Sequence, residues 1–213
     1  MVKLISLTQP LVEGIKTAEE LISYCARVSN PSNQMNTETA PKLLKYLIQH
    51  KHFSPFEMAS MTVQIKTSRA IAAQILRHRS FTFQEFSQRY STATELEDIE
   101  WRLQGKTNRQ VGEEPSELNT LLDFKVKQAQ RLSIEAYNDL IENGVARECA
   151  RMVLPLNTST TIYMHGTIRS FIHFLEIRCE EATQKEHRVV AEEIKKLFIE
   201  NFPSTSAALG WNI

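Results

Sequence analysis

The sequence predicts an α+β fold built as a single domain over residues 1–213. Segments with helical and with strand periodicity are mixed along the chain, without the regular alternation that a parallel βαβ protein requires. No internal repeat, low-complexity tract or linker divides the chain. Its 213 residues, 42% of them hydrophobic, can bury one sizeable core.

Three segments are predicted to be strands. Residues 2–7 are short and apolar-rich, and residues 160–164 have a similar character. In residues 61–66, apolar and polar side chains alternate, with Met61, Val63 and Ile65 on one face. That alternation predicts a sheet with one buried face.

Helices are predicted between these strands and after them. Thr17 and Glu20 have the spacing of a capping box, and Ser68 can cap the helix that leads to Arg77. The longest predicted helix, 118–143, carries its apolar residues close to one stripe. Further helices are predicted from near Pro41, at about 145–154, at 168–179 and at 184–198.

Two segments lack a clear period. Phe81, Phe83 and Phe86 nearly alternate with polar residues, which indicates an irregular extended segment with buried rings and polar groups turned toward a cleft. Residues 95–117 show no periodicity and contain scattered Gly and Pro, so they are predicted to form a long surface loop. Loops of that length are often functional or disordered.

The charge balance limits the classes of partner. Lys+Arg and Asp+Glu both number 25, which argues against a general nucleic-acid or membrane-surface binder. No signal peptide is recognisable, and no apolar run approaches the roughly 18 residues that span a bilayer. The three cysteines (Cys25, Cys149 and Cys179) form no Cys-x-x-Cys pair, so a soluble protein in the reducing cytoplasm is expected.

Several familiar catalytic motifs are absent. The sequence contains no Rossmann Gly-x-Gly-x-x-Gly, no P-loop and no Gly-x-Ser-x-Gly. The six histidines never show His-Glu-x-x-His spacing, so no catalytic metal is expected. Each cysteine falls in a helical pattern, where a small buried side chain is the usual role, so covalent cysteine catalysis is disfavoured.

Arginine carries the strongest chemical signal. Within residues 74–90, two arginines flank His78, and Glu85, Ser87 and Arg89 follow closely. Guanidinium groups match phosphate oxygens two hydrogen bonds at a time. The cluster therefore predicts a pocket for a phosphorylated small molecule, with Glu85 and Ser87 contacting its uncharged part. A surface loop that pairs its own charges is the alternative.

Further arginines lie in apolar or helical surroundings. Arg151 interrupts an apolar stretch, and a buried arginine needs an anion. Arg169 and His173 are i,i+4 neighbours on one helix face. Arg178 is rotated by roughly 140° from His173, so it should serve a different group. Pairing within the helix, for example of Arg178 with Glu181, is the alternative.

The motifs resemble those of a known family. Arg-His-Arg at 77–79 followed by Ser-x-Arg-Tyr at 87–90 resembles the signature Arg-His-Arg-x-x-Ser-x-x-x-x-Ser-x-Arg of the flavin-dependent thymidylate synthases. Segments 52–57, 147–155 and 169–178 resemble three further blocks, in the same order. The resemblance covers nearly the whole chain. It implies the thymidylate synthase-complementing type of fold, a central antiparallel sheet flanked by helices, and a homotetramer whose active sites are shared between subunits.

The resemblance also implies a reaction. Members methylate dUMP to dTMP, taking the methylene group from methylenetetrahydrofolate and the hydride from FAD that NADPH has reduced. No enzyme cysteine attacks the uracil, in keeping with the cysteines of this chain. Ser87 is assigned to substrate binding, because no base is spaced to activate it.

Site residues follow from the matching positions. The expected FAD contacts are Ser54, Arg77, His78, Arg79, Glu85, Thr167, Arg169 and His173. The expected dUMP contacts are Gln74, Arg77, Glu85, Phe86, Ser87, Gln88, Arg89, Arg151 and Arg178. Arg89 and Arg151 are expected at the phosphate. Arg178 and His52 are the expected catalytic residues: Arg178 would stabilise negative charge on the uracil, and His52 would lie beside the isoalloxazine and the folate.

The chain departs from the family pattern at a few positions. Thr82 replaces the first serine of the signature and keeps the hydroxyl, and Gln84 replaces a common asparagine. Thr167 and His173 stand where members often have asparagine.

Two other classes of function compete with this one. A nucleic-acid-binding module is suggested by arginines interleaved with Phe81, Phe83 and Phe86, because aromatic rings can stack on bases. The neutral charge and the absence of an RNP-type sequence speak against it. The third class is a helical interaction protein whose arginines pair internally.

Overall fold

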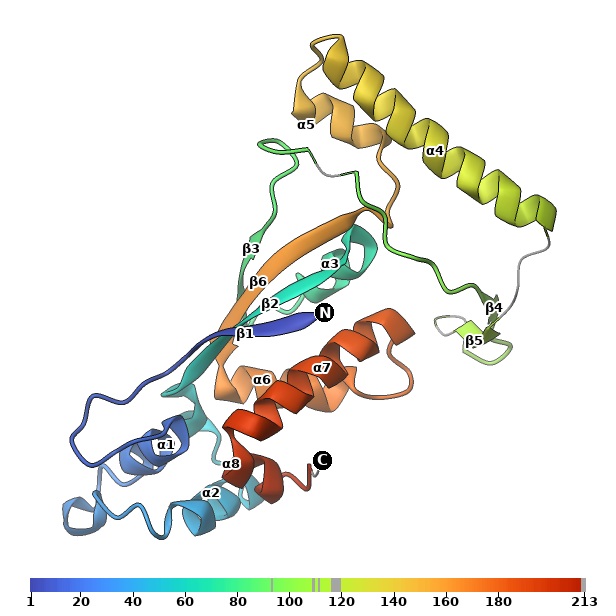
Figure 1. The fold of residues 1–213 in the computed structure, drawn as a ribbon. Helices are drawn as coiled ribbons and strands as arrows, with labels where there is room; N and C mark the ends of the chain where they lie inside the picture. The colour runs from blue at the N-terminus through green and yellow to red at the C-terminus, as the bar shows by residue number, and fades with distance from the viewer. Residues whose placement is uncertain (93, 109, 111, 116–119, 212–213) are drawn as a thin grey trace.

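A four-stranded antiparallel sheet forms the centre of the molecule (Figure 1). The computed structural model describes residues 1–92, 94–108, 110, 112–115 and 120–211. The strand order is β1-β2-β6-β3, with β1 Val2–Leu7, β2 Ser60–Ser68, β3 Thr82–Glu85 and β6 Ser159–Thr167. With helices around this sheet, the predicted α+β class is confirmed.

The alternation predicted for the second strand is confirmed. Val63 pairs with Met164 and Ile65 with Ile162 across the β2–β6 ladder, and all four side chains are buried. Met61, two residues before Val63, is buried on the same face. Because side chains alternate along a strand, the intervening polar residues point to the other face.

Helices cover the sheet and extend beyond its end. The main helices of the body are α1 Ala18–Ala26, α2 Ala40–Gln49, α3 Arg69–Ile75, α6 Ile168–Arg178, α7 Lys185–Asn201 and α8 Pro203–Ala208. The expected caps are present, because the Thr17 hydroxyl accepts from the backbone of Glu20 and Ser68 accepts from Ile71. Helices α6 and α7 pack on each other, α6 also contacts β6, and α3 contacts β2, β6 and α7. Helix α8 was not predicted.

Short 3-10 turns complete the body: η1 Pro31–Asn33, η2 Ser54–Glu57 and η3 Arg151–Val153. The helix predicted at 145–154 is instead α5 Arg147–Ala150 followed directly by η3. Among the described residues, no helix is both long and apolar enough to cross a membrane.

Residues 120–153 form an arm that projects from the body (Figure 1). The arm contains α4 Thr120–Glu142, then α5 and η3. The start of the long helix predicted at 118 lies outside the described residues. Leu121, Phe124 and Leu132 of α4 are 62%, 61% and 51% exposed, while Tyr137 is buried. Most of the apolar surface of α4 is therefore not covered by this chain.

The two segments without a clear period are more regular than predicted. Residues 82–85 form strand β3, because they continue the sheet beside β6 rather than following an irregular path. The predicted loop at 95–117 contains a small hairpin of β4 Arg102–Gln104 and β5 Gly112–Pro115, and Leu96 bridges to Thr158. The predicted burial of the rings holds for Phe81, whereas Phe86 is 38% exposed because it lies beyond the end of β3.

The chain between α3 and β3 is fixed to the sheet by a close ring contact. The Phe81 ring lies over Gly166 of β6, and a Cβ added at Gly166 would come within 2.4 Å of its Cδ1 atom. The same ring packs against Phe171 and Phe174 of α6, with centroids 4.9 and 5.8 Å away. Only glycine leaves room for this contact.

The Gly166→Ala substitution is therefore expected to destabilise the fold by about 1–3 kcal/mol, the usual cost of overpacking a core. Chemical denaturation of wild type and variant measures the change in unfolding free energy. Phe81→Leu in the Gly166→Ala background should recover part of the loss, because the smaller side chain relieves the contact. Equal stability of wild type and Gly166→Ala would contradict the close contact.

Candidate active site

The segment 77–81 lies along α6 and joins two of the predicted motif blocks. Arg178, in the last turn of α6, donates a hydrogen bond from Nε to Nε2 of His78 at 2.8 Å. The His78 ring packs edge-on against Phe174, with centroids 4.9 Å apart. Nearer the start of α6, the Ser170 hydroxyl donates to the backbone oxygen of Ser80 at 3.2 Å. Residues a hundred positions apart in sequence thus meet over the length of the helix.

His78 is neutral at physiological pH. Burial, then the nearby charges of Arg178, His173 and Arg77, lower its pKa to about 4. Since Nε2 accepts from Arg178, the single ring proton lies on Nδ1. A neutral histidine holds the Arg178 guanidinium in place without cancelling its charge, so that charge stays available to an anion.

The other cations of this region differ in exposure and in pairing. We call Arg77, His78, Arg79, Arg169, His173 and Arg178 the α6 group. Arg77 and Arg79 are exposed, and neither they nor Arg178 have a carboxylate within 4 Å among the described residues. Arg169 pairs with Glu57 of η2 at 2.5 Å. The pairing within the helix that was considered for Arg169 and Arg178 is not observed.

Arg77 and Arg79 are the two guanidiniums of this group that are exposed and have no carboxylate partner among the described residues. Guanidinium groups of this kind can bind a pyrophosphate, so the prediction that the α6 group contacts FAD stays a prediction. Thr167 has a structural task as well: it caps α6, and its hydroxyl accepts from the backbone of Ser170 at 3.2 Å.

His52 and Ser54 lie at η2, the turn that the Arg169–Glu57 pair ties to α6. Both are exposed. The His52 ring is 6.3 Å from Tyr46 in an edge-on arrangement. The expected catalytic histidine therefore lies at the surface, two residues before η2.

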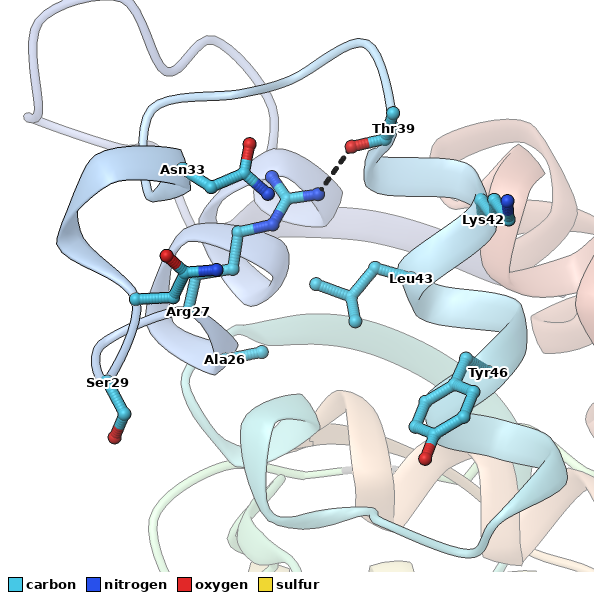
Figure 2. A pocket seen from close by; sticks show the side chains of 9 residues that line it. Ala26, Arg27, Ser29, Asn33, Thr39, Lys42, Leu43 and Tyr46 are labelled. Carbon is cyan, nitrogen blue, oxygen red and sulfur yellow. Dashed lines mark hydrogen bonds between the residues drawn. The ribbon is translucent and has the colours of Figure 1, made fainter.

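A pocket of about 460 Å³ lies between α1 and α2, and Tyr46 is one of the residues that line it (Figure 2). Arg27 lines it, but its guanidinium already donates to the backbone oxygen of Asn36 and, at 2.7 Å, to the Thr39 hydroxyl. Arg27 thus fastens α1 to the start of α2. None of the predicted site residues lines this pocket.

A second group of predicted residues gathers where β3 meets the arm. We call residues 85–89 and Arg151 the arm group. Arg89 pairs with Glu148 of α5 at 3.1 Å, and a pocket of about 310 Å³ lies beside them, lined by Ser87, Arg89, Tyr90, Ala146, Arg147 and Glu148. Glu85 accepts from the Thr160 hydroxyl at 3.0 Å and lies 3.4 Å from Arg69.

The rest of the arm group offers unmatched polar atoms. Gln88 is buried, and its Nε2 has no hydrogen-bond partner. Arg151 in η3 is partly buried and has no carboxylate within 4 Å in the described part of the chain. Arg151 was expected to need an anion, and no carboxylate of the described residues supplies one. A bound ligand could supply it.

The two groups are separate in a single chain. Strand β3 leads from the 77–81 segment to the arm, and α5 and α6 lie well apart in Figure 1. Of the predicted dUMP set, Arg178 lies at the end of α6 and Gln74 lies on α3 against the start of α7, whereas Arg89 and Arg151 lie at the arm. The predicted dUMP contacts are therefore divided between two parts of the chain.

The sequence analysis did not predict that Gln184 and His187 contact the Gln74 side chain. Its side chain donates from Nε2 to Gln184 at 2.6 Å, and its oxygen lies 3.4 Å from His187 Nδ1. His187 occurs on the buried stripe of α7 together with Val190 and Ile194. A histidine on an apolar stripe was the one signal in the sequence that pointed to it.

Comparison with known proteins identifies the family. A sequence profile of the thymidylate synthase complementing proteins matches residues 10–204. The chain is 53% identical over 212 residues to a probable flavin-dependent thymidylate synthase of Paramecium bursaria Chlorella virus 1, and the match covers 98% of both chains. It is 48% identical over 215 residues to the flavin-dependent thymidylate synthase of a Synechocystis strain, with 99% of both chains covered.

A solved structure shares the fold. The UMP/dUMP methylase PolB from Streptomyces cacaoi, bound with 5-Br dUMP, matches with a TM-score of 0.84 and 25% identity, over 99% of this chain and 94% of that chain. The motif blocks, the α6 group and these relatives agree: the chain belongs to the family of flavin-dependent thymidylate synthases.

Proposed function

We propose that the protein methylates dUMP to dTMP, with methylenetetrahydrofolate as the carbon donor and NADPH as the reductant of bound FAD. Its relatives are named flavin-dependent thymidylate synthases, and its structural neighbour is named a UMP/dUMP methylase. The observation that carries the proposal is the contact between His78 and Arg178, which unites two separate motif blocks in one cationic surface. Bound FAD would supply the hydride.

In this proposal, the α6 group together with Ser54 and Thr167 holds the flavin, and Glu85 is supplied by the arm group of another chain. Arg77 and Arg79 would neutralise its pyrophosphate, because both are exposed and lack acidic partners among the described residues. His52, at the surface beside η2, would contact the isoalloxazine and the folate.

The arm group would hold the nucleotide, with Arg89 and Arg151 at its phosphate. The Arg89–Glu148 pair is no obstacle, since both side chains are more than half exposed, at 66% and 54%. Exposed ion pairs contribute only about 0–1 kcal/mol, so a doubly charged phosphate can displace Glu148. Phe86, Ser87 and Gln88 would contact the remainder of the nucleotide, and the unpartnered Nε2 of Gln88 would gain a partner.

Arg178 would act on the uracil. Negative charge that develops on the ring at N3 would be stabilised by its guanidinium, which His78 holds in advance. Gln74 would contact the same ring. A positive group fixed before the reaction avoids the cost of reorganising water around the developing charge.

The proposal includes a homotetramer with active sites shared between subunits, and the same geometry supports it. The α6 group of one chain would face the arm group of another, since a single chain keeps them apart. Leu121, Phe124 and Leu132, exposed on α4, would be covered by the neighbouring subunit. Three free cysteines are in keeping with a cytoplasmic location.

The structure argues against the nucleic-acid-binding alternative, because most of the aromatic rings that were expected to stack on bases are not exposed. Phe81 is buried among α6 and β6, and Phe83 packs against the core. Only Phe86 of the three rings is exposed, at 38%. A surface that stacks successive bases needs more than one available ring.

Turnover of the purified protein tests the proposal. We expect a flavin absorbance spectrum after FAD is supplied, and dTMP formation that requires dUMP, methylenetetrahydrofolate and NADPH together. A colourless protein that never takes up FAD would exclude the reaction. Loss of product when any one component is omitted is the control.

The Arg89→Ala variant tests the phosphate role. Loss of a charge-assisted hydrogen bond of about 1.5–3 kcal/mol should weaken dUMP binding by roughly 10- to 150-fold while FAD binding persists. Equilibrium titration with dUMP measures the affinity. Arg131→Ala is the matched control, because Arg131 lies on exposed α4 and pairs only with Glu135 among the ion pairs described. An unchanged dUMP affinity for Arg89→Ala would reject the assignment.

A further inference from the structure

A chain of hydrogen bonds leads from Arg102 of β4 through the start of α7 to Gln74 of α3, the residue proposed to contact the uracil, and ends at His187 of α7. Arg102 donates to Oε1 of Glu186 at 2.6 Å, and Gln184 donates from Nε2 to Oε2 of Glu186 at 2.9 Å. Gln74 donates from Nε2 to Oε1 of Gln184 at 2.6 Å. Nδ1 of His187 lies 3.4 Å from Oε1 of Gln74 and ends the chain.

The direction of every bond in this chain is determined by its charged end. A guanidinium only donates and a carboxylate only accepts, so Gln184 must turn its NH₂ group to Glu186. Its oxygen is then left for Gln74, which must turn its own NH₂ group to Gln184. The oxygen of Gln74 therefore faces His187, and Nδ1 of His187 must carry the proton.

The surroundings of His187 agree with that proton position. The side chain is 1% exposed, and its Nε2 atom has no hydrogen-bond partner. Burial, then the charges of Arg178 and His78, lower its pKa to about 4. The ring is thus neutral and carries one proton. It packs 5.9 Å from Phe174 and 6.3 Å from His78, between centroids, so it is held at the inner side of the α6 group.

An oriented amide distinguishes uracil from cytosine. The Gln74 amide keeps one N–H and one oxygen lone pair beyond those used in the chain. Uracil offers an N3–H donor beside a carbonyl acceptor, whereas cytosine offers an N3 acceptor beside an amino donor. For a ring in a given position, one orientation of the amide matches uracil and the reversed orientation matches cytosine.

We infer that His187 is a positioning residue which, with Gln184, holds the Gln74 amide in one orientation and so makes the site selective for the uracil ring. The inference rests on the proposed function, in which Gln74 contacts dUMP. Reversal of the amide would set oxygen against oxygen at Gln184 and N–H against N–H at His187. The Glu186–Arg102 ion pair prevents the chain from reversing as a whole, because neither charged group can exchange its role.

Two variants test the inference on the FAD-loaded enzyme. His187→Leu fills a similar volume but removes the donor, so dUMP affinity should fall about tenfold and the preference for dUMP over dCMP should fall with it. His187→Asn restores a donor near the position of Nδ1 and should recover most of the preference. Flavin content and flavin reduction by NADPH should stay as in wild type for both.

The Glu186→Gln variant tests the orientation of the hydrogen-bond chain independently of His187. The amide in the E186Q variant can donate or accept, so the whole chain can reverse, and the preference for dUMP over dCMP should fall several-fold without unfolding. Glu192→Gln is the matched control, because Glu192 lies on exposed α7 surface and pairs with Arg188 within the same helix. That control should behave as wild type.

The measurements are equilibrium titrations with dUMP and dCMP. The inference is overturned if His187→Leu and Glu186→Gln both keep the wild-type preference, or if His187→Asn is as impaired as His187→Leu. Should His187→Leu fail to fold, Glu186→Gln decides alone. Turnover of the wild-type enzyme tests the proposed reaction separately, so a failure of either idea can be told from a failure of the other.

Discussion

A neutral histidine among guanidiniums is the interaction on which the site depends. Protonated His78 would add a third positive charge between Arg77 and Arg178 and would lose the lone pair that accepts from Arg178. Packing against Phe174 and Phe81 supplies the burial that keeps the ring neutral. Packing against the core thus keeps His78 neutral, and the positive charges of the neighbouring arginines remain available to an anion.

Packing in the same core also separates the two groups of predicted site residues within one chain. Close packing over Gly166 brings the 77–81 segment onto α6, while β3 carries the following residues away toward the arm. The residues proposed to bind the phosphate and the uracil are consequently separated within the chain. The exposed apolar side chains of α4 lie on that same arm. The proposed assembly with shared sites would account for both the separation of the groups and the exposed face of α4.

Local patterns in the sequence predicted much of the fold. Alternation placed β2, and cap chemistry placed the starts of α1 and α3, because these signals act over a few residues. The motif blocks supplied the site residues on which the proposal rests. Local sequence patterns could not reveal that His78 accepts a hydrogen bond from Arg178, or that His187 contacts Gln74. Both contacts join residues about a hundred positions apart. A stripe on α4 likewise predicts an apolar face but not which chain covers it.

Mixing two inactive variants tests most directly whether the site is divided between subunits. Arg89→Ala and Arg178→Ala each remove one half, so at dUMP well below KM either variant alone should form little dTMP. After subunit exchange in an equal mixture, random assembly should restore about a quarter of the wild-type activity, because one site in four receives both arginines. Absence of any recovery, with FAD bound and assembly intact in both variants, would contradict the account.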